Sequence, residues 1–187
     1  MGYRLSKIYT RTGDKGTTGM AGGERIEKDS ARVAAIGDMD ELNCHIGLVI
    51  SEQPSAELKE ILLTIQHDLF NVGGELCMPE HSVMTEQRVV WLEDRLDELN
   101  ENLPPLLEFI LPGGGKAASQ CQLARAMCRR TERSIVGLAR EMEINNAVKA
   151  YVNRLSDLLF VLCRVLSREA GEDEVYWKSE RLAKLEA

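Results

Sequence analysis

The chain has 187 residues, of which 44% are hydrophobic and 28% charged, and its formal net charge is −7. This length suffices for one domain with a sizeable core, and an acidic balance disfavours nucleic-acid binding, which needs a concentrated basic patch. No stretch is apolar and long enough to span a bilayer, and the N-terminus lacks the apolar run of a signal peptide.

The cysteines indicate a reducing compartment. There are five, an odd number, and no two form a Cys-x-x-Cys pair. Cys121 and Cys128 share a helix face, but two helical turns separate them by about 10 Å, which is too far for a disulfide. The sequence therefore predicts a cytoplasmic protein with neither a membrane partner nor a nucleic-acid partner.

Residues 1–28 carry little hydrophobic periodicity and many glycines. The run Thr10–Thr18 (TRTGDKGTT) alternates glycine with Thr, Lys and Asp, and Lys28 follows just before the first predicted helix. Such a segment can form a concave nest of backbone N–H groups for phosphate oxygens. Its spacing matches neither a Walker A loop nor a Rossmann fingerprint. The segment by itself leaves phosphate binding and a flexible leader equally open.

Apolar residues then recur at steps of three and four in three successive segments, which predicts amphipathic helices at about 29–51, 54–76 and 86–99. Thr85 is placed to cap the third. Asp40 lies on or beside the apolar face of the first helix. A carboxylate there is either a surface residue at the edge of that face or the partner of a buried cation, and the sequence alone favours the first.

The segment from Leu106 to Gly115 follows two prolines and is too apolar to be left in water, so an ordered loop is expected. Phe109 is its conspicuous residue. Such a phenylalanine usually plugs the end of a bundle; the alternative is a wall for a large flat ligand.

A fourth helix is predicted from about Lys116 to Glu143. Arg125, Arg129 and Glu132, at i, i+4 and i+7, lie along one of its faces, with Arg133 one turn beyond Arg129. Exposed, salt-bridged charges explain such a run. The alternative is a polyphosphate site, which bidentate arginines suit better than lysines do.

Small residues form a stripe beside these arginines and let another backbone come close: Ala118, Cys121, Ala124 and Cys128. A fifth helix, from about 146 to 169, has a regular apolar seam and a second apolar face. Asn153 and Asp157 interrupt it one turn apart, where a buried pair could set the register. The extra face and the small stripe predict burial against other copies of the chain.

The sequence thus predicts one all-α domain, residues 1–187. It consists of an N-terminal segment (1–28), a five-helix bundle (29–170) and a tail (171–187) that packs on the outside.

Six motifs occur in one order along the chain: Thr10–Thr18, Gly23-Glu-Arg with Lys28-Asp29, Asp40-Glu-Leu-Asn43, Phe109-Ile-Leu-Pro-Gly-Gly114, Arg125 with Arg129-Arg-Thr-Glu-Arg133, and Asn153-Arg-Leu-Ser-Asp157. With these motifs the chain resembles the PduO-type ATP:cob(I)alamin (corrinoid) adenosyltransferases. The resemblance runs from Tyr9 to about Arg168. It implies a homotrimer with active sites between subunits, transfer of the 5′-deoxyadenosyl group of ATP to Co(I), and release of triphosphate.

The resemblance also implies residue roles. Those that would bind the nucleotide are Thr10, Arg11, Thr12, Gly13, Asp14, Lys15, Gly16, Thr17, Thr18, Lys28, Arg129, Glu132, Arg133 and Asn153. Asp40 would pair with Arg125 across the subunit interface beside the corrin, and Phe109 would lie under the corrin and keep the lower axial ligand off cobalt. Arg129 would also act in catalysis. Mg²⁺ would bridge phosphate oxygens rather than sit in a site made by the protein alone. A corrinoid reductase and an adenosylcobalamin-dependent enzyme would be transient partners.

Two other classes compete. A di-metal bundle of the ferritin kind needs paired Glu-x-x-His motifs, but the residues three before His45, His67 and His81 are leucine, threonine and methionine. A helical adaptor or nucleotide-binding regulator would explain the apolar seams but not Phe109. The enzyme is the preferred interpretation.

Overall fold

The computed structural model describes residues 8–185, apart from the side chain of Leu182. In this range the helices are α1 (Ala31–Ser51), α2 (Ala56–Cys77), α3 (Glu86–Glu101), α4 (Gly115–Leu138), α5 (Asn146–Glu169) and α6 (Glu180–Leu185). The strands are β1 (Thr17–Gly19) and β2 (Arg25–Glu27).

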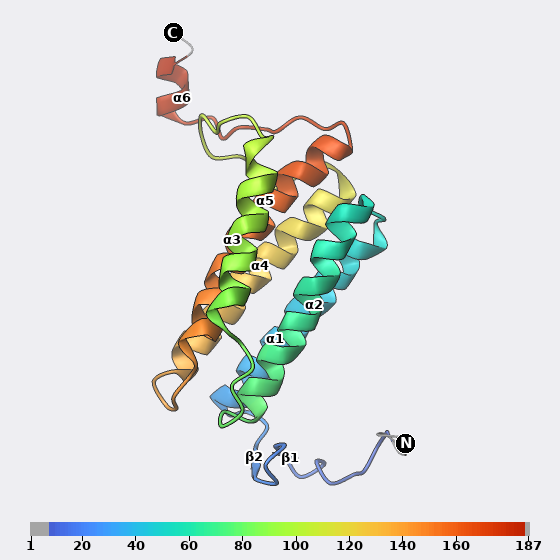
Figure 1. Ribbon diagram of the computed structural model, residues 1–187, viewed down its shortest axis with the longest axis vertical. Coiled ribbons are helices and arrows are strands. Elements are labelled where there is room, and N and C mark those ends of the chain that lie inside the picture. The colour runs from blue at the N-terminus through green and yellow to red at the C-terminus, as the bar shows by residue number, and fades with distance from the viewer. Residues whose placement is uncertain (1–7, 186–187) are drawn as a thin grey trace.

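The five long helices form a bundle in which neighbours in space are not always neighbours in sequence. The packed pairs are α1 with α2, α1 with α4, α4 with α5 and α3 with α5, so α1 and α4 lie side by side in the middle (Figure 1). The five predicted helices are confirmed. None of the helices within residues 8–185 is both long and apolar enough to cross a membrane.

One predicted helix end and one predicted capping hydrogen bond need correction. The fourth helix was expected to reach Glu143 but ends at Leu138, where the N–H of Ala139 bonds to the carbonyl of Ile135 and a turn follows. Ile144 in the next segment is buried, so the chain leaves the helix to place it in the core. Thr85 occupies the position before α3, but its side chain makes no capping hydrogen bond.

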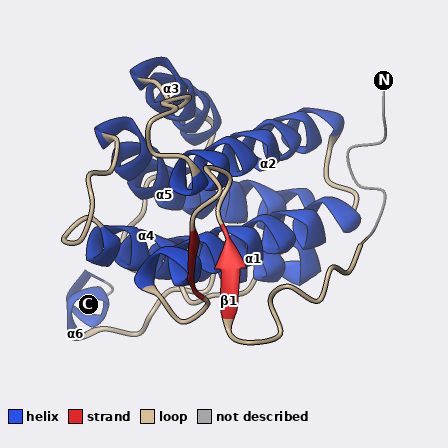
Figure 2. Ribbon diagram, turned by 90° about the horizontal axis from the view of Figure 1, so that it is seen from below, coloured by secondary structure: helices blue, strands red, loops and turns tan. Residues whose placement is uncertain are grey.

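The prediction of an all-α chain is wrong in one detail. β1 and β2 pair in an antiparallel hairpin, with Thr18 opposite Ile26. The hairpin lies beyond the N-terminal end of α1, in front of the helices in Figure 2. It gives the glycine-rich segment a defined shape.

The two features that predicted self-association are satisfied within one chain. The small stripe of α4 faces α5, since the Cys121 thiol bonds to the carbonyl of Leu159 at 3.4 Å and the Cys128 thiol to that of Val152 at 3.2 Å. On the second apolar face of α5, Tyr151, Leu158 and Val161 are buried within the chain, and α5 also packs on α3. These two features therefore give no support for contacts between copies, contrary to the expectation.

A buried polar network fastens α2, α3 and α5 together. Asp68 on α2 accepts a hydrogen bond from the Tyr151 hydroxyl at 2.9 Å and from Arg88 Nε at 3.0 Å. Burial raises the pKa of Tyr151, and the neighbouring Asp68 carboxylate raises it further. The phenol therefore stays protonated and acts as a donor.

The tail makes more contacts with the rest of the chain than the sequence suggested. It packs along the loop before α4, where Ile110 and Tyr176 form an antiparallel bridge. It then ends in α6, at the opposite end of the bundle from the hairpin (Figure 1). The prediction that the tail packs on the outside is confirmed for its described part.

Candidate functional site

A cavity of about 650 Å³ opens between the Phe109 loop, α4 and α5. Its walls are partly apolar, with Phe109, Phe160 and Val161, and partly charged, with Arg125 and Arg129. Phe109 itself is 75% exposed. It does not plug the bundle, and so the more usual role for such a phenylalanine is excluded.

A second hollow, of about 550 Å³, lies further along α4, and most of the residues that line it are charged. Arg129, Glu132, Arg133 and Arg140 line it. Arg129 lines both hollows. Arg125, one helix turn before it, lines only the larger cavity, and Arg133, one turn after it, lines only the charged hollow. Three guanidinium groups around one open hollow attract an anion such as a phosphate chain.

Glu132 and Asn153 are brought together across the contact between α4 and α5. The Asn153 amide donates to Glu132 Oε1 at 2.8 Å. Burial raises the pKa of the Cys128 thiol beneath them, and the nearby carboxylates of Glu132 and Asp157 raise it further, while Arg129 opposes the shift. Charged groups of both signs therefore lie close to Arg129, the residue that borders both hollows.

Asn153 and Asp157 do not form a buried pair. Both side chains are exposed, and Asp157 accepts instead from Arg154 Nη1 at 3.3 Å. The alternative that they set the register of the helix from inside the core is wrong. Asp157 lines the larger cavity, and Asn153 bonds to Glu132, which lines the charged hollow.

The N-terminal loop has an internal support, Arg25, to which the sequence analysis gave no role. Arg25 Nη2 donates to the carbonyl of Thr12 at 2.7 Å and to Thr17 Oγ1 at 2.8 Å, so one guanidinium closes the loop. The N–H of Lys28 bonds to the carbonyl of Gly16 at 2.8 Å. A Cβ built on Gly13 would lie 3.1 Å from Lys28 Nζ. The structure therefore brings Lys28 to the loop, as predicted.

The loop and the arginines of α4 are not brought together within one chain. No hydrogen bond or ion pair among the described residues joins Thr10–Lys28 to α4. The same holds for Asp40 and Arg125. Asp40 is exposed and has no ion-pair partner in the described part of the chain, and Arg125 Nε donates to Gln122 Oε1 at 2.8 Å.

Sequence reasoning missed several residues that the geometry adds. Arg25 stands inside a quoted motif and could have been found as the only arginine of the hairpin strands. Gln122, three residues before Arg125 and 7% exposed, was a polar residue on a buried face. Arg181 reaches the larger cavity from the tail, and no local pattern in the sequence points to it.

Within residues 8–185, no group of three or more His, Cys, Asp and Glu side chains lies close enough to hold a metal ion.

Comparison with known proteins places this geometry in a family. Residues 8–166 match the model of the cobalamin adenosyltransferases. The chain is 52% identical to a cobalamin adenosyltransferase from Cupriavidus metallidurans, over 97% of this chain and 99% of that protein. It is 46% identical to a corrinoid adenosyltransferase from Bacillus subtilis, over 92% of each.

A solved structure agrees with these sequence matches. It is a variant of the PduO-type ATP:corrinoid adenosyltransferase from Lactobacillus reuteri, complexed with cobalamin and ATP. It superposes with a TM-score of 0.88 at 38% identity, covering 92% of this chain and all of that one. The resemblance deduced from the six motifs is therefore confirmed, and the chain belongs to the cobalamin adenosyltransferase family.

Proposed function

We propose that this protein is an ATP:corrinoid adenosyltransferase. In the reaction, the electron pair of Co(I) attacks the 5′ carbon of ATP, a cobalt–carbon bond forms, and the bond from that carbon to the triphosphate oxygen breaks. Triphosphate leaves with the electron pair of that bond. The corrinoid supplies the nucleophile, so the protein contributes placement and electrostatics.

The observation that carries the proposal is the position of Arg129 between the two hollows. The larger cavity, with its aromatic and aliphatic walls, suits a flat macrocycle. The charged one suits a triphosphate. A guanidinium that borders both lies where negative charge accumulates on the leaving group, and stabilising that charge lowers the barrier.

Glu132, Arg133 and Asn153 hold the nucleotide on the α4–α5 face. The Asn153–Glu132 hydrogen bond fixes the direction of both polar groups before ATP binds. The Thr10–Thr18 loop and Lys28 close over the triphosphate. Arg25 supports this role, because it already holds the loop in a compact form.

Phe109 forms the lower wall of the corrin site. An apolar ring offers cobalt no ligand, and Co(I) forms most readily when no axial base donates to the metal. Its place in the wall of the larger cavity, with 75% of its surface exposed, supports this role, because the ring is free to contact a flat ligand there.

The complete site forms between subunits of a homotrimer, with Asp40 of one chain meeting Arg125 of the next. Two observations support this. Asp40 lacks an ion-pair partner in the described part of its own chain, and apolar side chains stand exposed on the outer faces of α1 and α4, including Leu48 (45%), Leu123 (54%) and Val136 (47%). Such side chains would be covered by a neighbouring subunit.

Mg²⁺ reaches the site on the phosphate oxygens of ATP, where it neutralises charge on the leaving group. The five cysteines are free, which supports a reducing compartment and hence the cytoplasm. A reductase that supplies Co(I) and an enzyme that uses the adenosylated product are the expected transient partners.

The test is an anaerobic assay. Purified protein, chemically reduced cob(I)alamin, ATP and Mg²⁺ are combined, and visible absorbance is followed. Loss of the Co(I) spectrum, with appearance of a light-sensitive alkylcobalamin, is the expected result. If the spectrum persists although ATP is bound, the protein is a nucleotide-binding regulator with the fold of the family.

A further inference from the structure

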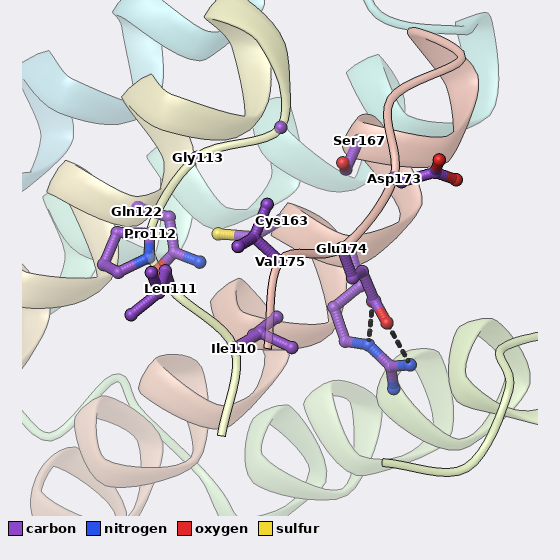
Figure 3. Close-up of a pocket in the computed structure, with 12 residues that line it drawn as sticks. Ile110, Leu111, Pro112, Gly113, Gln122, Cys163, Ser167, Asp173, Glu174 and Val175 are labelled. Atoms are coloured by element: carbon purple, nitrogen blue, oxygen red, sulfur yellow. Dashed lines mark hydrogen bonds and ion pairs between the residues drawn. The ribbon is translucent and has the colours of Figure 1, made fainter. Parts of the chain in front are cut away.

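A buried ion pair connects the bundle to the tail. Arg164 on α5 is 3% exposed. Its Nε donates to Glu174 Oε1 at 2.5 Å and its Nη2 to Glu174 Oε2 at 3.2 Å, as the dashed lines in Figure 3 show. Nη2 also donates to the carbonyl of Pro104 at 2.7 Å. One guanidinium therefore joins α5, the tail and the segment that follows α3.

Directly after Glu174, the tail pairs with the loop that carries Phe109. The N–H of Leu111 donates to the carbonyl of Val175, and the N–H of Trp177 donates to the carbonyl of Phe109, both at 2.7 Å. The ion pair thus lies at the start of a short antiparallel pairing. The position of Glu174 therefore sets the register of this pairing, that is, which tail residue lies opposite Phe109.

A second contact holds the same pairing at its far end. Ser179 Oγ donates to Glu108 Oε2 at 2.6 Å, and the N–H of Phe109 donates to Glu108 Oε1 at 2.9 Å. These two hydrogen bonds, that from Ser179 first, lower the pKa of Glu108 and keep it charged. The tail therefore donates to one oxygen of the carboxylate, and the loop donates to the other.

The ring of Phe109 depends on this backbone support. It is 75% exposed, and its aromatic neighbour, Trp177, is itself on the tail, with ring centroids 6.5 Å apart. A side chain with so little packing takes its position from the backbone that carries it. That backbone is held by the tail.

We propose that Arg164 and Glu174 are positioning residues for Phe109, acting through the tail on the loop that lines the corrin cavity. Removing one partner of a buried ion pair leaves the other charge unpaired, which displaces the segment on which it stands. The consequence for turnover rests on the proposed function. The consequence for the order of the loop does not.

The variant that tests this is Glu174→Gln. It keeps the size of the side chain and removes its charge, and it lies on the tail, outside the long helices. Asp173→Asn is the matched control. It makes the same change of charge at the preceding residue, which is exposed and forms no ion pair among residues 8–185.

The first measurement is hydrogen exchange of the amides of Leu111 and Trp177 in the intact protein. In Glu174→Gln both should exchange at least tenfold faster than in the wild type, and in Asp173→Asn at the wild-type rate. Unchanged exchange in Glu174→Gln would overturn the proposal. So would a loss of the helical circular dichroism signal, because the pair would then hold the core rather than the loop.

The second measurement uses the corrinoid. With ATP present, the spectrum of bound cob(II)alamin reports whether the lower axial ligand has left cobalt. Glu174→Gln should show less of the ligand-free species and a kcat at least tenfold lower, with KM for ATP within twofold of the wild type. Faster exchange with an unaltered spectrum and kcat would refute the link to Phe109. If the wild type itself fails to turn over, the proposed function fails, while the exchange data still decide whether the pair holds the loop.

Discussion

Arg129 and Phe109 act at different points of the proposed reaction, and their surroundings explain why. Arg129 is an exposed guanidinium beside other cations, so it is available to an anion. Phe109 is an exposed aromatic ring at the far side of the larger cavity, so it is available to an apolar face. Arg129 should therefore stabilise the leaving triphosphate, and Phe109 should affect the coordination of cobalt.

Replacing Arg129 by alanine should reduce kcat by about 100- to 1000-fold, the usual effect of removing one group that stabilises developing negative charge. ATP should also bind more weakly, and the melting temperature should be unchanged because the side chain is exposed. Steady-state kinetics, ATP titration and thermal melting measure the three effects.

Arg130→Ala is the control for that change. Arg130 is the next residue and equally exposed, but it pairs with Asp38 and Glu41 on the surface of α1 and lines neither hollow. Exposed pairs contribute about 0–1 kcal/mol to stability. If both variants kept wild-type kinetics, the arginines of α4 would have no part in the mechanism.

Replacing Phe109 by alanine should slow turnover at least tenfold while ATP affinity stays nearly the same, because the ring lines the corrin cavity and not the charged hollow. Phe70→Ala is the matched control, since Phe70 on α2 is 72% exposed and lines neither hollow. A Phe109→Ala enzyme as fast as the Phe70→Ala enzyme would remove the ring from the account of cobalt activation.

Among the elements, the N-terminal hairpin has the clearest conformational requirement. Gly16 has φ of +91°, where an L-residue is strained, and its carbonyl accepts the N–H of Lys28. Gly22 does not have a positive φ, and nothing lies within 4 Å of a Cβ built there. The two glycines therefore form a natural pair for comparison.

Gly16→Ala should raise KM for ATP several-fold, because alanine in the left-handed region costs about 1–2 kcal/mol and opens the loop. Thermal melting of the bundle should be unaltered. Gly22→Ala should leave KM as it is. Equal KM values in the two variants would mean that the shape of this loop does not matter for ATP.

The elements also show how far the sequence could lead. Helix α5 was predicted at its observed ends because its apolar steps are regular throughout, and the structure adds Asn145 as its N-terminal cap. The hairpin was not predicted, since strands of three residues are too short to show alternation. Helical spacing placed Arg129, Glu132 and Arg133 on one face, and the structure agrees. The Arg164–Glu174 pair could not be foreseen, because it depends on where the tail returns to the bundle.

At the scale of the whole molecule, the buried protonated groups predict a loss of stability in alkali. Burial raises the pKa of Cys128 and Tyr151. The pKa of Cys121 is raised first by a hydrogen bond with the Cys163 thiol and then by burial. Below about pH 8.5 the thiols keep their protons in both the folded and the unfolded chain, so stability is complete. Above that pH only the unfolded chain releases the thiol protons, and above about pH 10 only the unfolded chain releases the Tyr151 proton. The free energy of unfolding then falls by up to about 1.4 kcal/mol per pH unit for each group that titrates in this way.

Urea unfolding between pH 7 and 10.5, at one protein concentration and with a reductant, measures this slope. Cys128→Ala should make it shallower, whereas the same change at the exposed Cys44 should have no such effect. A free energy of unfolding that stays constant up to pH 10.5 would contradict the assignment of these groups as buried and protonated.

The proposed trimer makes a prediction of its own. Asp40→Ala and Arg125→Ala should each lose at least tenfold in kcat. In mixed trimers, an interface that combines Asp40 from one variant with Arg125 from the other is intact, so part of the activity should return. Separately assembled variants, mixed without exchange of subunits, are the control. Mixed trimers without recovery would place both residues in a site formed by one chain.

Tracing the 5′ carbon of ATP tests the central claim most directly. ATP labelled with ¹³C at that position is incubated anaerobically with Mg²⁺, cob(I)alamin and the enzyme, and the corrinoid and phosphate products are separated. We predict a carbon bonded to cobalt in the ¹³C NMR spectrum of the corrinoid, with one triphosphate released for each. Label that stays in ADP or free adenosine, with an unalkylated corrinoid, would contradict adenosyl transfer by this protein.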